Sequence, residues 1–266
     1  MPWRIRAFAS HTIGVAALAT GCASWLPAPA PMHTIATRAH ADRPARCLLI
    51  LLPGLGDSAG DFADHGFIAA LRKRNLSVDS ISANATLGYY ARETLIERLE
   101  TDVLAPARKV GYEQIWVAGI SLGGMGSVLL AESHASELTG LILIAPYLGD
   151  DKILDEIESS GGVAHWKAGK ATGDYRREMW RWLQGAIARP ASAPAIYLAS
   201  GDQDRLRRGH RLLAEQLPRN RVFRTIGNHD WGPWSVLWDN VLDRSDFAAQ
   251  CTDSGLDRGT LPREIP

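Results

Sequence analysis

Five residues, Gly119-Ile120-Ser121-Leu122-Gly123, constrain the fold more than any other stretch of the chain. An apolar run over 114–118 precedes them, and 124–132 has the composition of a helix. A serine with glycine two positions before and after it, between strand and helix, is typical of a very tight turn. Such a turn lifts the hydroxyl to a helix N-terminus, where developing negative charge is favoured. We therefore predict that Ser121 is a nucleophile.

Apolar runs alternate with amphipathic stretches along the rest of the chain. Buried strands are predicted at 47–52, 76–83, 114–118, 138–145, 195–200 and 221–226, and helices at 62–74, 90–110, 124–132, 206–216 and 234–249. Continuous apolar strands are typical of a parallel sheet covered on both faces. Strands that alternate with helices imply right-handed crossovers. The fold class is therefore α/β, with a mostly parallel central sheet flanked by helices.

Length and charge limit the kind of protein. A chain of 266 residues fits one α/β domain with a leader. The net charge is zero, with 29 basic and 29 acidic residues, which argues against a nucleic-acid partner because such proteins carry a basic surface. No His-Glu-x-x-His or Cys-x-x-Cys pattern is present, so neither a metal site nor a cofactor is predicted.

The first 22 residues have the pattern of an export signal. Arg4 and Arg6 precede a small, apolar stretch over 7–20 that is too short to span a bilayer. The ending Ala19-Thr20-Gly21-Cys22 resembles a bacterial lipobox, which implies cleavage before Cys22 and its lipidation. We expect an exported protein, periplasmic or anchored to a membrane through Cys22. Secretion without a lipid and an ordinary N-terminal helix are the alternatives.

The region after the leader predicts where the folded domain begins and ends. Residues 23–45 include a Pro/Ala-rich run that cannot form a helix and are expected to be an extended tether. The domain is expected over 46–250, with a tail over 251–266. Cys47 opens the first buried strand and Cys251 opens the tail, so a disulfide would pin the tail to the sheet. Two unpaired thiols are the alternative.

Two later strands end in residues that a nucleophilic serine needs. A serine hydroxyl requires a base within hydrogen-bond reach and an acid to orient that base. The strand over 195–200 runs into Gly201-Asp202-Gln203-Asp204, and the strand over 221–226 runs into Gly227-Asn228-His229. In a parallel sheet these loops meet at the carboxyl ends of the strands. The chain order is Ser, Asp, His.

With these residues the chain resembles the α/β-hydrolase superfamily of serine hydrolases over about 46–248. The resemblance implies that Asp204, three positions after Gly201, is the triad acid and that His229 is the base. Asp202, in the same loop, is the second candidate for the acid.

An oxyanion hole is also implied, made by the backbone N–H groups of Leu122 and Leu55. The segment 53–58 resembles the His-Gly-Leu-Gly-Asp-Ser loop of the small carboxylesterase/phospholipase branch, but Pro53 stands where that branch has histidine. A phosphate-binding loop is the weaker interpretation of this glycine-rich stretch, because no Gly-Lys-Ser/Thr follows.

The segment over 147–190 lies where this superfamily inserts a cap. It is polar, contains glycine, and has predicted helices at 151–158 and 174–188. Aromatic side chains here and near the predicted loops are candidate walls of an apolar substrate site: Tyr89, Tyr90, Trp166 and Trp231. Packing of the cap and the core is the alternative role for them.

We therefore expect a hydrolase that cleaves a small or medium carboxylic ester through an acyl-serine intermediate. Cleavage of a thioester, amide or carbon–carbon bond by the same triad is a second hypothesis. A non-catalytic binding protein on a hydrolase scaffold is a third. The sequence does not specify the acyl or alcohol group, or the oligomeric state.

Overall fold

The structure is a computed structural model that describes residues 26–170 and 173–253. The predicted leader with Cys22, and residues 254–266 of the predicted tail, lie outside the described residues. None of the helices in the described part combines the length and hydropathy that a membrane span requires.

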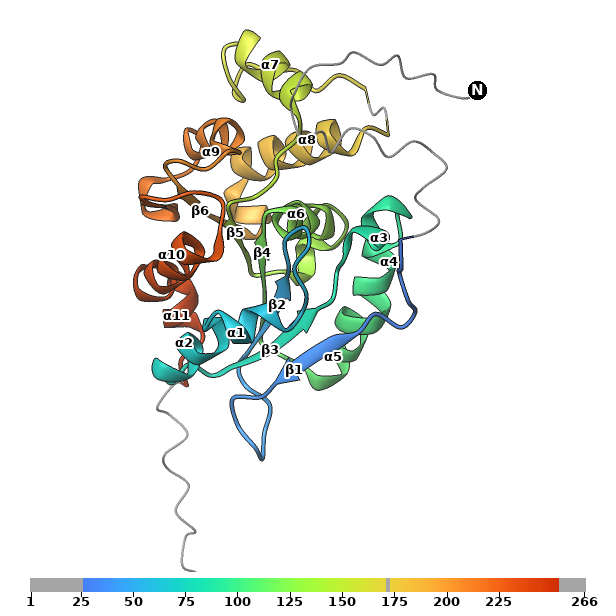
Figure 1. Ribbon diagram of the computed structural model, residues 1–266, viewed down its shortest axis with the longest axis vertical. Helices are drawn as coiled ribbons and strands as arrows, with labels where there is room; N and C mark the ends of the chain where they lie inside the picture. Colours follow the sequence, from blue (N-terminus) through green and yellow to red (C-terminus); the bar gives the residue numbers. More distant parts are fainter. Residues whose placement is uncertain (1–25, 171–172, 254–266) are drawn as a thin grey trace, which may run out of the picture.

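A seven-stranded sheet in the order β1-β3-β2-β4-β5-β6-β7 forms the centre of the molecule (Figure 1). Its strands are β1 (Thr34–Thr37), β2 (Cys47–Leu52), β3 (Val78–Ala83), β4 (Gln114–Ile120), β5 (Gly140–Ile144), β6 (Ala195–Gly201) and β7 (Val222–Thr225). All neighbours pair in parallel except β1, which runs antiparallel to β3. The predicted fold class is confirmed, and the parallel arrangement brings the loops after β2, β4, β6 and β7 to one end of the sheet.

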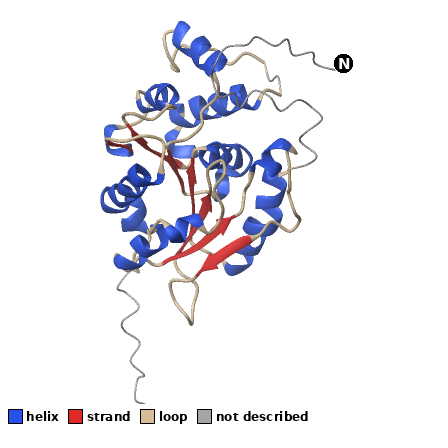
Figure 2. Cartoon of the chain, viewed as in Figure 1, coloured by secondary structure: helices blue, strands red, loops and turns tan. Residues whose placement is uncertain are grey.

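Helices cover both faces of the sheet, as the continuous apolar strands predicted (Figure 2). Within β2, Leu48, Ile50 and Leu52 enter one hydrophobic cluster, while Leu49 and Leu51 enter the other. The helices that contribute buried side chains to the first cluster are α3 (Leu87–Ala91), α4 (Leu95–Leu99), α5 (Ala105–Val110), α6 (Leu122–His134), α7 (Asp151–Ser159), α8 (Tyr175–Ala188) and α9 (Arg207–Ala214). Those of the second are α1 (Asp61–Asp64), α2 (Phe67–Lys73), α10 (Trp231–Arg244) and α11 (Asp246–Gln250).

Three predicted helices are interrupted in the structure. The helix expected over 62–74 is divided at Gly66, which has a left-handed backbone (φ 79°). The helix expected over 90–110 breaks at Glu93 (φ 57°) and contains a π-helical turn, Glu100–Leu104. The helix expected over 234–249 begins at Trp231 and ends at Arg244, before the separate α11. Apolar periodicity persists across such breaks, so it does not reveal them.

The predicted tether over 23–45 is corrected by the structure for residues 26–45. This segment packs on the domain, where Met32 is buried and residues 34–37 form the edge strand β1. Thr34 pairs with Ala83 and Thr37 with Ser80, so the segment completes the sheet. The folded domain therefore begins about twenty residues before the predicted boundary at 46.

The predicted cap segment, 147–190, contains α7 and α8 close to the expected positions. The indole of Trp180 in α8 is buried and donates to the carbonyl of Leu148 at 2.7 Å. On α9, Arg208 pairs with Asp155 and Glu158 of α7 at 2.6 and 2.7 Å. Apolar packing and ion pairs thus attach both helices to the domain.

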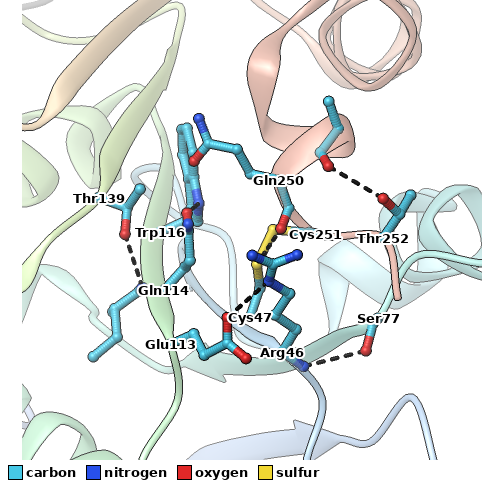
Figure 3. The surroundings of a disulfide bond; sticks show 12 residues. Arg46, Cys47, Ser77, Glu113, Gln114, Trp116, Thr139, Gln250, Cys251 and Thr252 are labelled. Carbon is cyan, nitrogen blue, oxygen red and sulfur yellow. Dashed lines mark hydrogen bonds and ion pairs between the residues drawn. A yellow bond between two sulfur atoms is a disulfide. The ribbon is translucent and has the colours of Figure 1, made fainter. Parts of the chain in front are cut away.

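A disulfide joins Cys47, the first residue of β2, to Cys251, just after α11 (Figure 3). Both cysteines are fully buried. The backbone N–H of Ser77 also donates to the carbonyl of Cys251 at 2.7 Å. Of the two alternatives left open by the sequence, the structure has the bridge, and the domain extends to Cys251.

Candidate active site

Ser121 sits in the strained turn that its flanking glycines predict. Its backbone has φ 51° and ψ −111°, a region that residues with a side chain rarely adopt. A Cβ on Gly119 would lie 2.2 Å from the carbonyl oxygen of Gly123, and one on Gly123 would lie 2.0 Å from that of Leu52. Only glycine fits at either position. The turn therefore depends on both glycines, as the sequence indicated.

The last residue of β5 and the loop after it hydrogen-bond to the backbone of Ser121. The N–H of Ser121 donates to the carbonyl of Ile144 at 3.0 Å, and the N–H of Tyr147 donates to the carbonyl of Ser121 at 2.9 Å. Between them, Ala145 also has a positive φ of 46°. Two hydrogen bonds thus fix the peptide groups on both sides of the nucleophile candidate.

The structure brings together Ser121, His229 and Asp204 from three loops at the carboxyl end of the sheet. His229 Nε2 lies 2.8 Å from Ser121 Oγ, and His229 Nδ1 lies 2.8 Å from Asp204 Oδ2. With the proton on Nδ1, the imidazole donates to the carboxylate and accepts from the serine hydroxyl. This is the geometry of a nucleophile, a base and an orienting acid.

The loop after β6 distinguishes the two candidate acids. Asp204 is fully buried, and its Oδ1 accepts a hydrogen bond from the N–H of Leu206 at 2.7 Å. Burial alone would raise the pKa of the Asp204 carboxyl, but the hydrogen bonds from His229 and Leu206 outweigh burial and lower this pKa. Asp202 is exposed. Asp204, the first choice from the sequence, is therefore the ionised partner of His229.

His210 on α9 is a neighbour of the site that the sequence did not single out. Its ring is buried, and its Nε2 donates to the carbonyl of Pro146 at 3.0 Å. Burial lowers the pKa of His210, although the Asp204 carboxylate opposes this shift. The neutral ring supports the loop that hydrogen-bonds to Ser121. His210 lies nine residues after Gly201 in the sequence, and no motif marks it as a residue near the site.

The two expected oxyanion donors come from neighbouring segments. Leu122 is the first residue of α6, and helix N–H groups in the first turn have no acceptor within the helix. Leu55 lies in a turn after β2 in which the N–H of Asp57 donates to the carbonyl of Gly54. A Cβ on Gly54 would lie 3.6 Å from the Cβ of Ser121. The loop that carries Leu55 thus packs against the nucleophile candidate.

Tyr89 and Tyr90, two of the candidate substrate contacts, make bonds within the protein. The buried Tyr89 hydroxyl donates to the carbonyl of Pro29 at 2.7 Å, in the N-terminal segment. Tyr90 donates to the carbonyl of Leu122 at 3.1 Å. Burial raises the pKa of the Tyr90 hydroxyl, which remains protonated and able to donate. Tyr90 thus supports the first turn of α6.

Trp166 and Trp231 have different surroundings. Trp166 is buried in the cap, where its indole donates to Glu156 at 2.9 Å, so packing is its role in this structure. Trp231 is half-buried beside the site, and its indole donates to Asp57 at 3.2 Å. It also stacks on His65, with ring centroids 4.3 Å apart. Trp231 therefore joins the Leu55 loop to the His229 loop.

Two other places resemble binding sites but lie away from Ser121, Asp204 and His229. Cavities of about 280 and 150 Å³ lie between α6 and α8 and between α8 and β6, and no triad residue lines either. The side chains of Glu100, His134 and Glu137 converge as metal ligands would. However, the Arg108 guanidinium lies 2.6 Å from Glu100 and 2.7 Å from Glu137, so a cationic side chain already pairs with both carboxylates.

No protein-family model and no curated protein matches the sequence. Solved structures match the fold. S-formylglutathione hydrolase FrmB from Staphylococcus aureus is 16% identical, with a TM-score of 0.54 over 76% of this chain and 81% of that one. Est1E from Butyrivibrio proteoclasticus is 17% identical, with a TM-score of 0.54 over 82% and 94%. A ferulic acid esterase is 16% identical, with a TM-score of 0.54 over 76% and 85%. This chain therefore has the α/β-hydrolase fold.

Proposed function

We propose that the protein is a serine hydrolase that cleaves a small or medium carboxylic ester. The observation that carries the proposal is the continuous hydrogen-bonded chain from Ser121 Oγ through the His229 ring to Asp204, with 2.8 Å at each step. Acyl transfer requires a serine nucleophile, a base hydrogen-bonded to it and an acid that orients the base. Ser121, His229 and Asp204 are arranged in this way.

In the first half-reaction, Ser121 Oγ attacks the ester carbonyl while its proton moves to His229 Nε2. Negative charge develops on the carbonyl oxygen, where the N–H groups of Leu122 and Leu55 stabilise it. The carbon–oxygen bond to the alcohol then breaks. The alcohol leaves with the proton from Nε2, and the acyl group remains on Ser121.

In the second half-reaction, water replaces the alcohol. His229 Nε2 takes a proton from the water as its oxygen attacks the acyl carbon, and returns that proton to Ser121 Oγ as the acid leaves. Asp204 keeps the imidazole in the required tautomer and stabilises its charged form.

The test is Ser121→Ala with p-nitrophenyl butyrate as substrate. Loss of the nucleophile is expected to lower kcat on the order of 10⁶-fold, because the remaining groups cannot form the acyl intermediate. Ser192→Ala, at an exposed serine, is the matched control and keeps full activity. A fluorophosphonate probe is expected to label the parent chain and the control, but not Ser121→Ala.

Two results would contradict the proposal. Undiminished hydrolysis by a folded Ser121→Ala protein would exclude Ser121 as the nucleophile. A parent chain that neither reacts with the probe nor cleaves any ester would favour a non-catalytic role. A matched butyryl thioester and amide, assayed beside the ester, decide which bond is cleaved fastest.

We also propose that the enzyme is exported and lipidated at Cys22. The bridge between Cys47 and Cys251 supports export, since buried disulfides are typical of oxidising compartments. Radiolabelled palmitate is expected to enter the parent chain but not Cys22→Ala. Incorporation that survives this substitution would exclude Cys22 as the lipid site.

A further inference from the structure

The N-terminal segment enters the domain at the end of the sheet that carries the active site. Because β1 runs antiparallel to β3, Thr34 at its start pairs with Ala83 at the carboxyl end of β3. The N–H of Asn84, directly after β3, donates to the carbonyl of His33 at 2.9 Å. Ser121, Asp204 and His229 follow carboxyl ends of strands in the same sheet. The chain that precedes β1 therefore approaches from the catalytic end.

The segment before β1 is firmly attached to α3 (Figure 1). A Cβ on Gly88 would lie 2.1 Å from the carbonyl oxygen of Pro27, so the two backbones are in direct contact. The Tyr89 hydroxyl binds the carbonyl of Pro29, and the N–H of Met32 donates to Asp102 at 2.7 Å. Tyr90 belongs to the same helix, α3, and its hydroxyl donates to the carbonyl of Leu122 in the first turn of α6.

Few residues separate Cys22 from the part of the N-terminal segment that contacts α3. Leu26 is the first residue that the structure describes, and it is four residues beyond Cys22. Four residues reach at most ~14 Å when fully extended, at roughly 3.6 Å each. An anchor at Cys22 would therefore be held close to α3, instead of at the end of the long tether that the sequence suggested.

Large apolar side chains are exposed at this same end of the sheet. Leu55, in the loop after β2, is 48% exposed, and Ile226, directly after β7, is 80% exposed. Leu55 lies in the expected oxyanion loop itself, and Ile226 lies three residues before His229. Burial of such side chains in an apolar phase is favourable because it removes apolar surface from water.

We propose that the catalytic end of the molecule rests on a lipid bilayer, held there by the short anchor at Cys22. The substrate class that follows is an amphiphilic ester dissolved in that bilayer, with a medium acyl chain, which enters from the lipid side past Leu55 and Ile226. This inference rests on the proposed esterase function and on the proposed lipidation.

The experiment lengthens the anchor in the full chain without altering the site. A flexible Gly/Ser spacer of about 20 residues is inserted between Ser24 and Trp25, and the lipidated protein is reconstituted in phosphatidylethanolamine/phosphatidylglycerol vesicles. Two substrates are compared, p-nitrophenyl octanoate dissolved in the vesicles and water-soluble p-nitrophenyl acetate. The control carries the same spacer at the C-terminus.

The spacer is expected to lower the rate on the vesicle-bound ester about tenfold or more and leave the rate on the soluble ester unchanged. The C-terminal control changes neither rate. Unchanged rates on both esters in the spacer variant would overturn the proposed orientation. Failure to cleave either ester without a spacer would instead refute the proposed function.

A second pair of variants tests the apolar contact itself. Ile226→Ser is expected to weaken hydrolysis of the vesicle-bound ester severalfold and leave acetate hydrolysis unchanged. Val110→Ser is the control, since Val110 is 44% exposed but lies before β4, at the opposite end of the sheet. Equal effects of the two substitutions on the vesicle-bound ester, or none from either, would show that Ile226 faces water, a second copy or a protein.

Discussion

Asp204 and Asp202 illustrate how burial assigns a role within one loop. They are two residues apart, yet Asp204 is fully buried and accepts hydrogen bonds from His229 and Leu206, whereas Asp202 is exposed. The two hydrogen bonds hold the carboxylate charged despite its burial. A carboxylate that accepts from Nδ1–H in this way keeps the imidazole of His229 in one tautomer.

Substitutions of the two aspartates are expected to have different effects on catalysis. Asp204→Asn is expected to lower kcat for p-nitrophenyl butyrate by roughly 10⁴-fold, because an amide favours the wrong imidazole tautomer. Asp202→Asn is expected to leave kcat unchanged. Steady-state kinetics on both folded variants make the comparison, and the opposite ranking would assign the acid to Asp202.

The triad candidates could be predicted because each is tied to a local pattern. Ser121, Asp204 and His229 follow glycines at strand ends, and those spacings are readable in the sequence. Roles that depend on packing could not be predicted in this way. Tyr90 and Trp166 are aromatic residues that sequence cannot place inside or outside a pocket, and His210 reaches Pro146 only through the fold.

At the scale of elements, the strands were easier to predict than the helices. The six strands expected in the parallel sheet are present, because residues such as Leu48 to Leu52 are apolar on both faces. The helix breaks at Gly66 and Glu93 were missed, since apolar spacing is the same in straight and broken helices. The sequence did not predict β1, because this strand has only four residues, Thr34 to Thr37, and they are half-exposed or exposed. It therefore lacks the continuous apolar run by which the other strands were predicted.

The turn between β4 and α6 gives a prediction about backbone space. Gly123→Ala would place a Cβ 2.0 Å from the carbonyl oxygen of Leu52, so β2 or α6 must move. We expect a loss of about 1–3 kcal/mol in the free energy of unfolding. A displacement of ~1 Å at Ser121 would lower kcat about 100-fold.

Gly60→Ala is the matched control for this substitution. Gly60 has φ −71°, which any residue adopts, and an added Cβ meets nothing closer than Ser58 Oγ at 3.7 Å. Urea unfolding and kinetics are measured on both variants. Equal tolerance at the two positions would mean that the turn at Ser121 is not sterically restricted.

On the scale of the whole molecule, the two ends of the domain are both fastened to the sheet. The N-terminal segment adds β1 at one edge, and the disulfide ties Cys251 to β2, 204 residues away in the chain. A covalent link over so long a loop restricts the unfolded chain strongly.

We expect Cys47→Ala/Cys251→Ala to lower the free energy of unfolding by about 2–5 kcal/mol, measured in guanidinium chloride. Dithiothreitol is expected to lower the stability of the parent chain by a similar amount and to leave the double variant unchanged. Identical unfolding curves for the parent chain with and without reductant, and two titratable thiols in the denatured chain, would show that no bridge forms.

The long separation of Cys47 and Cys251 also sets an order of events during biosynthesis. Ribosomes add roughly 5–20 residues per second, so the second cysteine is made roughly 10–40 s after the first. Until then Cys47 has no disulfide partner, and β2, which begins at Cys47, is not linked to the segment after α11. The domain is therefore completed only after its last helix has been synthesised, and in the interval Cys47 remains an unpaired thiol within a nascent chain.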